Sequence, residues 1–164
     1  MRRSAGILLH REVDGRVEVL LGHMGGPLWA RKDAGAWTIP KGEPADGEDP
    51  HVAAVREFTE EIGRPPPPGP EIDLGTVRQR GGKLVTAWAR RGDLDVTTIA
   101  SNPVEMEWPP RSGRRIVFPE LDRAAWFPLD EARALVIGGQ VPLLDALEAR
   151  LPGSSTDGGP PPLG

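Results

Sequence analysis

The segment from Asp49 to Gly63 constrains the fold of this chain more than any other, because its sequence defines both ends of one helix. Asp49 is suited to cap a helix N-terminus, and Pro50 is suited to the first helical position. Gly63 is suited to the left-handed position after a helix, and the prolines of residues 64–70 prevent the helix from continuing. The sequence therefore predicts a helix over residues 50–62.

Short apolar runs separated by turn signals predict β-strands on both sides of this helix. Asp14-Gly15 and Gly81-Gly82 each separate two such runs and predict two hairpins. The predicted strands cover residues 5–9, 17–21, 36–39, 72–80, 83–90 and 124–127, and later helices cover residues 129–137 and 141–151. Residues 100–118 are expected to form a long irregular stretch. Strands interleaved with helices indicate an α/β fold, with a mixed sheet covered by helices.

One domain is expected over residues 1–152, because a chain of 164 residues suits a single domain with a substantial core. Residues 153–164 are rich in Gly, Pro and Ser, and we expect them to form a flexible C-terminal tail.

The charge and cysteine content limit the partners and compartments that the chain suits. A net charge of −4 and a pI of about 5.4 argue against general binding to nucleic acid or to anionic membranes. The chain has no cysteine, which excludes disulfides, thiolate zinc sites and cysteine nucleophiles. Its apolar runs are too short for a signal peptide or a membrane span. We expect a cytoplasmic protein, a monomer or homodimer, that acts on a small molecule.

Three carboxylates on one face of the predicted helix point to a bound cation. Glu57, Glu60 and Glu61 are related by spacings of three and four residues, so they share one face and repel one another. They also lie near the helix C-terminus, where the helix dipole disfavours negative charge. Taken alone, such a triplet is more often a solvated acidic face. A hard cation such as Mg²⁺ or Mn²⁺ would offset the repulsion and could bridge to phosphates.

The wider spacing around these residues resembles a known family motif. Gly42, Glu48, Arg56 and the helix glutamates occur in the pattern Gly-x5-Glu-x7-Arg-Glu-apolar-x-Glu-Glu-x-Gly, which ends at Gly63. A chance match to seven fixed residues is very rare in a chain of this length. The pattern resembles the Nudix box, with Arg64 as a departure at its final apolar position.

Flanking segments extend this resemblance to about residues 4–151. Residues 37–43 are similar to the segment that precedes the box in many enzymes that cleave dinucleoside polyphosphates, and residues 125–132 are similar to the closing strand and helix of the family. Residues 25–30 and 102–110 resemble bacterial members described as nucleotide pyrophosphohydrolases. The resemblance implies a Nudix-type α/β/α sandwich with a mixed sheet.

The resemblance also implies a metal-dependent hydrolase and assigns roles to the residues of the box. Glu57 and Glu61 would be the principal ligands of Mg²⁺, with Mn²⁺ as a substitute, and Glu60 would bind directly or through water. The backbone carbonyl of Lys41 or Gly42 would add an oxygen ligand. Arg56 would orient the carboxylates and pair with Glu48. The residues with structural roles in the motif would be Gly42, Glu48 and Gly63.

The general base and the substrate contacts are less restricted by the motif. The base would be a helix glutamate or a loop carboxylate, for which the candidates are Glu105, Glu107 and Glu120. Lys41 is the best candidate for a phosphate contact, because it adjoins the box. Further candidate substrate contacts are Arg31, Lys32, Arg78, Trp29 and Trp108, where the tryptophans could stack on a base. Arg80 and Lys83 flank the same turn as Arg78. Trp37, Trp88 and Trp126 are expected in the core or at its edge.

The sequence is compatible with several classes of substrate. The first expectation is a nucleoside triphosphate or a dinucleoside polyphosphate. Relatives hydrolyse ADP-ribose, capped RNA 5′ ends or diphosphoinositol phosphates, and the sequence excludes none of these. A domain that senses nucleotides without catalysis is a further alternative, although every glutamate of the box is retained.

Overall fold

The computed structural model describes residues 2–152, so the predicted tail of residues 153–164 lies outside the described part. The strands are β1 (Arg3–Val13), β2 (Arg16–Met24), β3 (Trp37–Thr38), β4 (Lys41–Gly42), β5 (Glu71–Arg78), β6 (Leu84–Arg91), β7 (Pro103–Glu107), β8 (Arg115–Pro119) and β9 (Leu121–Pro128). The helices are α1 (Pro50–Ile62), α2 (Leu129–Leu135), the short 3-10 helix η1 (Gly138–Gln140) and α3 (Val141–Arg150).

A seven-stranded mixed sheet lies at the centre of the fold. Its main path follows the order β3-β2-β1-β6-β5, while β4 pairs with β1 and β9 pairs with β2. β1 and β6 run parallel, with Arg3 opposite Leu84, and the other paired strands run antiparallel. The central β1 is therefore bordered by three strands that come from different parts of the chain.

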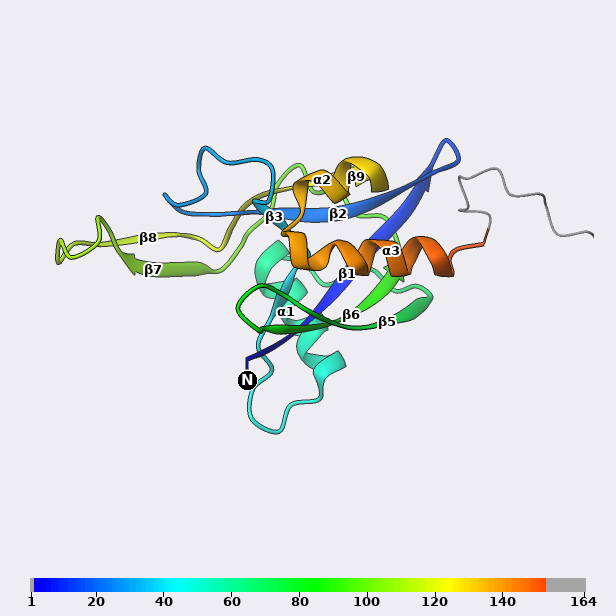
Figure 1. Cartoon of the computed structure of the whole chain (residues 1–164), viewed down its shortest axis with the longest axis horizontal. Coiled ribbons are helices and arrows are strands. Elements are labelled where there is room, and N and C mark those ends of the chain that lie inside the picture. Colours follow the sequence, from blue (N-terminus) through cyan, green and yellow to red (C-terminus); the bar gives the residue numbers. More distant parts are fainter. Residues whose placement is uncertain (1, 153–164) are drawn as a thin grey trace, which may run out of the picture.

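Helices cover both faces of this sheet, which confirms the predicted α/β/α sandwich (Figure 1). Side chains alternate between the two faces, as the two-residue period of a strand requires. Ile7 and Leu9 pack toward Phe58 of α1, whereas Leu8 packs in a second cluster with Leu144 of α3. Of the helices within residues 2–152, none is long and apolar enough to cross a lipid bilayer.

The predicted turn and helix signals have the expected backbone geometry. Asp14 and Gly15 both have positive φ, at 52° and 77°, which suits the tight turn between β1 and β2. The carboxylate of Asp49 accepts hydrogen bonds from the first turn of α1, and Gly63 ends the helix with φ of 92°. Helix α1 therefore begins and ends at the predicted residues.

The expectation of an irregular stretch at residues 100–118 is wrong, because β7 and β8 form an antiparallel hairpin there. The hairpin projects away from the main sheet (Figure 1). In it, Val104 pairs with Phe118 and Met106 with Ile116 on a half-buried face. Prolines and charged residues break up this apolar alternation, so the pattern of a two-sided strand was weak in the sequence. The last strand is also longer than predicted, and α2 ends earlier.

Candidate active site

Arg56 of α1 organises the carboxylates around it. Its guanidinium donates two hydrogen bonds to Glu48, at 2.8 and 2.9 Å, in the predicted pairing. The same group donates to Glu57 at 3.0 Å and to Glu60 at 3.1 Å. The bonds from Arg56 to Glu48, with another from the Ala45 backbone N–H, lower the pKa of Glu48 to about 2. The loop before α1 is thereby fastened to the helix, and two of its glutamates are held in place.

Gly42 is required by the close approach of a carboxyl group. A Cβ atom at this position would lie 2.0 Å from the Glu57 carboxyl carbon, so a larger residue would displace it. The glycine lies in β4, which pairs with β1 of the sheet. The Glu57 carboxyl group therefore packs directly on the backbone before the helix, close to the carbonyl oxygens expected to bind metal.

Glu61 is a buried carboxyl group at the floor of the site. It is 2% exposed, and it accepts a hydrogen bond from the Lys41 backbone N–H. Burial, followed by the nearby charge of Glu120, raises its pKa, and burial also raises the pKa values of Glu57 and Glu120. A cation among these carboxyl groups would favour their charged forms.

The Lys41 ammonium group lies among these carboxyl groups and beside a second lysine. Burial and the adjacent Lys83 lower the pKa of Lys41, while Glu61 and Glu120 oppose this effect. Lys83 also interacts with the Lys41 side chain directly. The structure thus brings a cation of the β5–β6 turn into the site, although the sequence suggested only that it flanked a turn.

Lys41 and Glu61 line a cleft of about 220 Å³ that has both polar and apolar lining residues. The polar residues are Thr38, Lys41, Glu61 and Glu120. The apolar residues are Met24, Trp29, Val104, Phe118 and Leu121. This composition suits a ligand with a charged end and a flat or apolar end.

Several residues of this cleft were not identified from the sequence. Gly25 packs against the Pro119 carbonyl, and Phe118 lies against Gly26, so the loop after β2 is closely packed against the end of β8. In the sequence, only the Gly25-Gly26 pair indicated that another segment packs closely against this loop. Nothing near Phe118 or Leu121 in the sequence indicated their place in the cleft, because it depends on pairing between distant strands.

The remaining candidates occupy different positions. Of the three loop carboxylates, the structure places Glu120 in the cleft, whereas Glu105 pairs with Arg115 and Glu107 accepts bonds from the backbone of the hairpin turn. Trp108 lies in that turn, outside the cleft. Arg31 is exposed in the loop after β2.

The two other basic candidates, Lys32 and Arg78, lie outside the lining of this cleft. The ammonium group of Lys32 lies 5.2 Å from the ring centre of Trp29. Arg78 lines a separate cleft beside the β5–β6 turn. The core tryptophan Trp37 is buried, as expected, whereas Trp88 and Trp126 are half-buried at the core edge.

His23 serves the structure of the loop that carries Trp29. It is fully buried, and one ring nitrogen lies 3.0 Å from Asp122 while the other lies 2.7 Å from the Lys32 carbonyl oxygen. The imidazole therefore connects the loop after β2 to the start of β9, and both structures contribute to the cleft.

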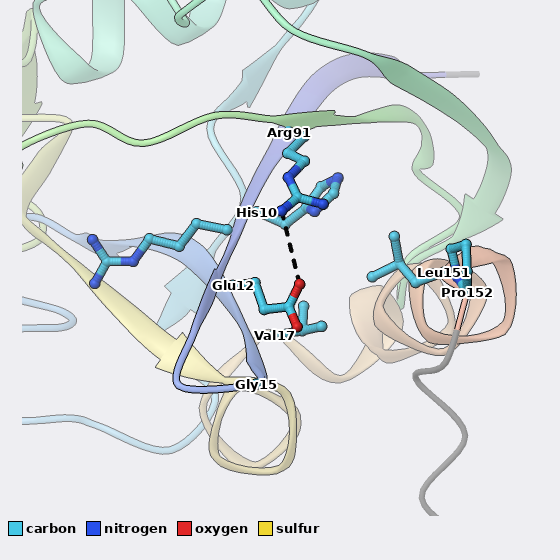
Figure 2. Close-up of a pocket in the computed structure, with 8 residues that line it drawn as sticks. His10, Glu12, Gly15, Val17, Arg91, Leu151 and Pro152 are labelled. Atoms are coloured by element: carbon cyan, nitrogen blue, oxygen red, sulfur yellow. Dashed lines mark ion pairs between the residues drawn. The ribbon is translucent and has the colours of Figure 1, made fainter.

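A small cavity of about 80 Å³ lies at the far end of β1 and contains none of the predicted site residues (Figure 2). It lies beside His10, Arg91 and Glu12, and the last two form an ion pair at 3.7 Å. Leu151 and Pro152 form another part of its wall.

The donor set of the main site suits a hard divalent cation that retains several waters. Within residues 2–152, no three Asp, Glu, His or Cys side chains are grouped so as to hold a metal by themselves. Mg²⁺ is commonly held by one or two carboxylates, water and substrate phosphates, so it needs no such group. Glu57 and Glu61, whose carboxyl groups repel each other, are the side chains that would hold it here.

Comparison with known proteins identifies a family model, described as the NUDIX domain, that matches residues 1–147. The structure is similar to a C. elegans Ap4A hydrolase in a binary complex, with TM-score 0.64 and 22% identity over 91% of this chain and 96% of that one. It is also similar to the NUDIX domain of Shewanella oneidensis NrtR complexed with ADP ribose, with TM-score 0.63 and 14% identity over 92% and 88%. A NUDIX hydrolase from Nitrosomonas europaea has TM-score 0.60 and 20% identity over 90% and 88%.

Proposed function

Because the chain belongs to the Nudix family, we propose that it is a metal-dependent hydrolase that cleaves a phosphoanhydride of a nucleoside diphosphate linked to another group X. The observation that carries this proposal is that Lys41, Glu61 and Glu120 line the same cleft as the aromatic side chains of Trp29 and Phe118. Phosphates require cations, and a nucleobase requires a flat apolar surface, so the cleft suits both ends of a nucleotide.

The favoured substrates are a nucleoside triphosphate and a dinucleoside polyphosphate. Trp29 and Phe118 offer aromatic surfaces on which a base can stack. Lys41 would contact the non-bridging oxygens of a phosphate near Glu61. The likeness to an Ap4A hydrolase agrees with the second substrate but concerns the fold alone.

The residues around the reacting phosphate would have three roles, which are metal binding, positioning of carboxylates and stabilisation of phosphate charge. Glu57 and Glu61 would hold Mg²⁺ or Mn²⁺, with Glu60 bound through water and a carbonyl of residue 41 or 42 as a further ligand. When bound, the cation would neutralise phosphate charge and make a coordinated water more acidic. Arg56 keeps Glu57 and Glu60 in position through its hydrogen bonds. Lys41 would stabilise the charge on the leaving phosphate oxygens.

Glu120 is the favoured general base among the three loop candidates. Its carboxyl group lines the cleft and interacts electrostatically with Lys41 and Glu61. Burial raises its pKa, which makes it a better proton acceptor than an ordinary glutamate. Glu105 and Glu107 have partners within their own hairpin instead.

Substitution of Glu57 and Glu61, the two proposed metal ligands, tests the proposed site directly. Glu57→Gln and Glu61→Gln should each lower kcat by at least about 100-fold, because each removes a charged ligand. The assay would measure phosphate released from nucleoside triphosphates, diadenosine polyphosphates, ADP-ribose, capped RNA and diphosphoinositol phosphates, with Mg²⁺ or Mn²⁺. EDTA should abolish turnover by the unmodified protein.

Glu131→Gln, an exposed substitution on α2, provides the matched control and should retain turnover. Circular dichroism should verify that each variant is folded. Undiminished activity in both ligand variants would rule out the site. Absence of turnover on every substrate, together with tight nucleotide binding, would favour the sensor alternative.

A comparison of two carboxylates tests the assignment of the base. Glu120→Gln should lower kcat by about 100-fold and leave KM within a few-fold, because a general base acts in the chemical step. Glu105→Gln, in the projecting hairpin, should leave both constants near their original values. Equal kinetic losses in the two variants, or full activity of Glu120→Gln, would exclude Glu120 as the base.

A further inference from the structure

A second cleft, of about 540 Å³, lies beside the β5–β6 turn and is strongly basic. Its lining residues are Arg2, Arg78, Gln79, Arg80, Gly81, Gly82 and Lys83. Four of these seven residues carry a positive charge, and none carries a negative charge. Such a surface in a chain of net charge −4 indicates a local site for an anion rather than a general property of the molecule.

The cations of this basic cleft are poorly neutralised by the protein. Arg2 pairs with Glu43 at 3.1 Å, and both side chains are mostly exposed. In the described part of the chain, Arg78, Arg80 and Lys83 form no ion pair with a carboxylate within 4.0 Å. Positive charges gathered without partners repel one another, and a multiply charged anion would relieve that repulsion.

The turn that forms the basic cleft is held in a defined shape. The Gln79 backbone N–H donates to the Lys83 carbonyl at 2.7 Å, and the Gly82 N–H donates to the Gln79 carbonyl at 3.0 Å. The Gln79 side chain accepts a hydrogen bond from Gln140, which is fully buried. Gly81 and Gly82 both have φ of 87°, a conformation that glycine adopts readily. The cations are therefore presented by an anchored turn.

Lys83 connects the basic cleft to the catalytic cleft. Its side chain lines the basic cleft and also interacts with Lys41, which lines the catalytic one. Both lysines lie beside the first part of β1, because Gly6 pairs with Lys41 and Arg3 pairs with Leu84, the residue after Lys83. The cations thus form a path from Lys41, through Lys83, toward the arginines Arg2, Arg78 and Arg80 of the basic cleft.

We propose that the basic cleft binds phosphate groups of X, so that X is itself polyphosphorylated. This inference rests on the proposed function, and it narrows the substrate class within it. A linear phosphate chain that ends in a second nucleoside has this chemistry. A phosphorylated ring that bears a diphosphate would present similar phosphates to the basic cleft, but it carries no nucleoside. ADP-ribose lacks such phosphates, because only an uncharged sugar lies beyond its diphosphate.

Charge removal at the outer end of the path tests this proposal. The double variant Arg78→Ala/Arg80→Ala replaces two exposed side chains, so it should fold normally. Its kcat/KM for diadenosine tetraphosphate, divided by its kcat/KM for ADP-ribose, should fall by about 10-fold or more. Arg16→Ala removes an exposed arginine at the opposite end of β1 and should leave this ratio unchanged. An unchanged ratio in the double variant would overturn the proposal.

A diphosphoinositol phosphate distinguishes the two kinds of polyphosphate. If the substrate is a phosphorylated ring, the double variant should lose about 10-fold in kcat/KM on the diphosphoinositol phosphate, relative to ADP-ribose, and the unmodified protein should turn over diadenosine tetraphosphate poorly. If X is a linear phosphate chain, the loss of about 10-fold should occur on diadenosine tetraphosphate, and the unmodified protein should turn over the diphosphoinositol phosphate poorly. Equal losses on all three substrates would show that the arginines act on the protein rather than on X, and would overturn the proposal.

A binding measurement separates this proposal from the proposed function. Calorimetry with inorganic tripolyphosphate needs no turnover, and the double variant should bind it at least about 10-fold more weakly than the Arg16→Ala protein. Loss of this binding in a protein that hydrolyses no nucleotide would overturn the proposed hydrolase and retain the anion site. Equal binding by both variants in an active hydrolase would overturn the anion site alone.

Discussion

Arg56 contacts three carboxylates at once, and this single residue illustrates how the site is assembled from local charges. Its fork of N–H groups matches the geometry of Glu48, which lies in the loop before the helix. The same fork reaches Glu57 and Glu60, which lie on its own helix. A lysine could not make these bonds simultaneously, because its ammonium group lacks the planar fork.

His10 is a buried histidine outside the cleft that Lys41 and Glu61 line, and its protonation should affect the stability of the fold. Its ring is 4% exposed, and within residues 2–152 its Nε2 has no hydrogen-bond partner. Burial, followed by the charge of Arg91 beside it (Figure 2), lowers its pKa from 6.5 to about 4. The unfolded chain therefore binds this proton more readily than the folded protein does.

The free energy of unfolding should consequently decrease as the pH falls. The stability that the neutral form of His10 contributes to the folded state is fully present above about pH 6.5. It is lost progressively as the pH falls toward about 4, by at most about 3 kcal/mol. Urea unfolding of the protein and of His10→Leu at several pH values would measure it. The variant should have a shallower pH dependence over this interval. Parallel pH profiles would contradict the prediction.

At the scale of the element, helix α1 has one face that packs into the core and another that carries the glutamates of the proposed site. Phe58 and Ile62 pack into the core, while Glu57 and Glu61 lie toward β4. Because residues three and four apart lie on one side of a helix, the spacing of the glutamates places their carboxyl groups on the same face of α1.

Gly63→Ala should destabilise the protein by about 1–3 kcal/mol, because Gly63 has φ of 92° and an added Cβ would lie 2.9 Å from the Ala100 backbone. Gly138→Ala is a suitable control, since a Cβ there meets no atom within 4 Å. Urea unfolding would compare the two variants. A smaller loss for Gly63→Ala than for Gly138→Ala would show that the helix end does not require glycine.

At the scale of the whole molecule, the proposed catalytic cleft forms where distant parts of the chain meet. The loop after β2, the lead-in to α1, and the segment from β8 to β9 all contribute lining residues. These segments meet because β9 pairs with β2, and β4 pairs with β1. The strands and α1 of the sandwich therefore hold part of the lining in place, while the loop after β2 and the projecting hairpin contribute the rest.

Gln140 joins three of these distant parts. It is fully buried, accepts a hydrogen bond from the Ile39 backbone N–H, and donates to Thr38 and Gln79. Gln140→Leu should lower the free energy of unfolding by about 1–3 kcal/mol, because it leaves the Ile39 N–H buried without a partner. Urea unfolding and hydrogen exchange at the Ile39 amide would measure the effect. An unaltered exchange rate at that amide would contradict it.

The sequence by itself determined helix α1, its caps, the two predicted hairpin turns and the grouping of Glu57, Glu60 and Glu61. Each of these depends on residues close together in the chain, where backbone preferences and the helical repeat act directly. The alternation of strands and helices also predicted a mixed sheet covered by helices, and the resemblance to the Nudix family implied the sandwich. The ion pair between Arg56 and Glu48 was implied by the resemblance of this segment to the Nudix box.

Only the tertiary structure decided which distant residues join that segment. Glu120 enters the cleft whereas Glu105 does not, and Lys83 reaches Lys41 from another turn. The hairpin of β7 and β8 was likewise hidden by its mixed composition. Such choices depend on strand pairing and packing between segments far apart in the chain, and no local pattern of residue types encodes them.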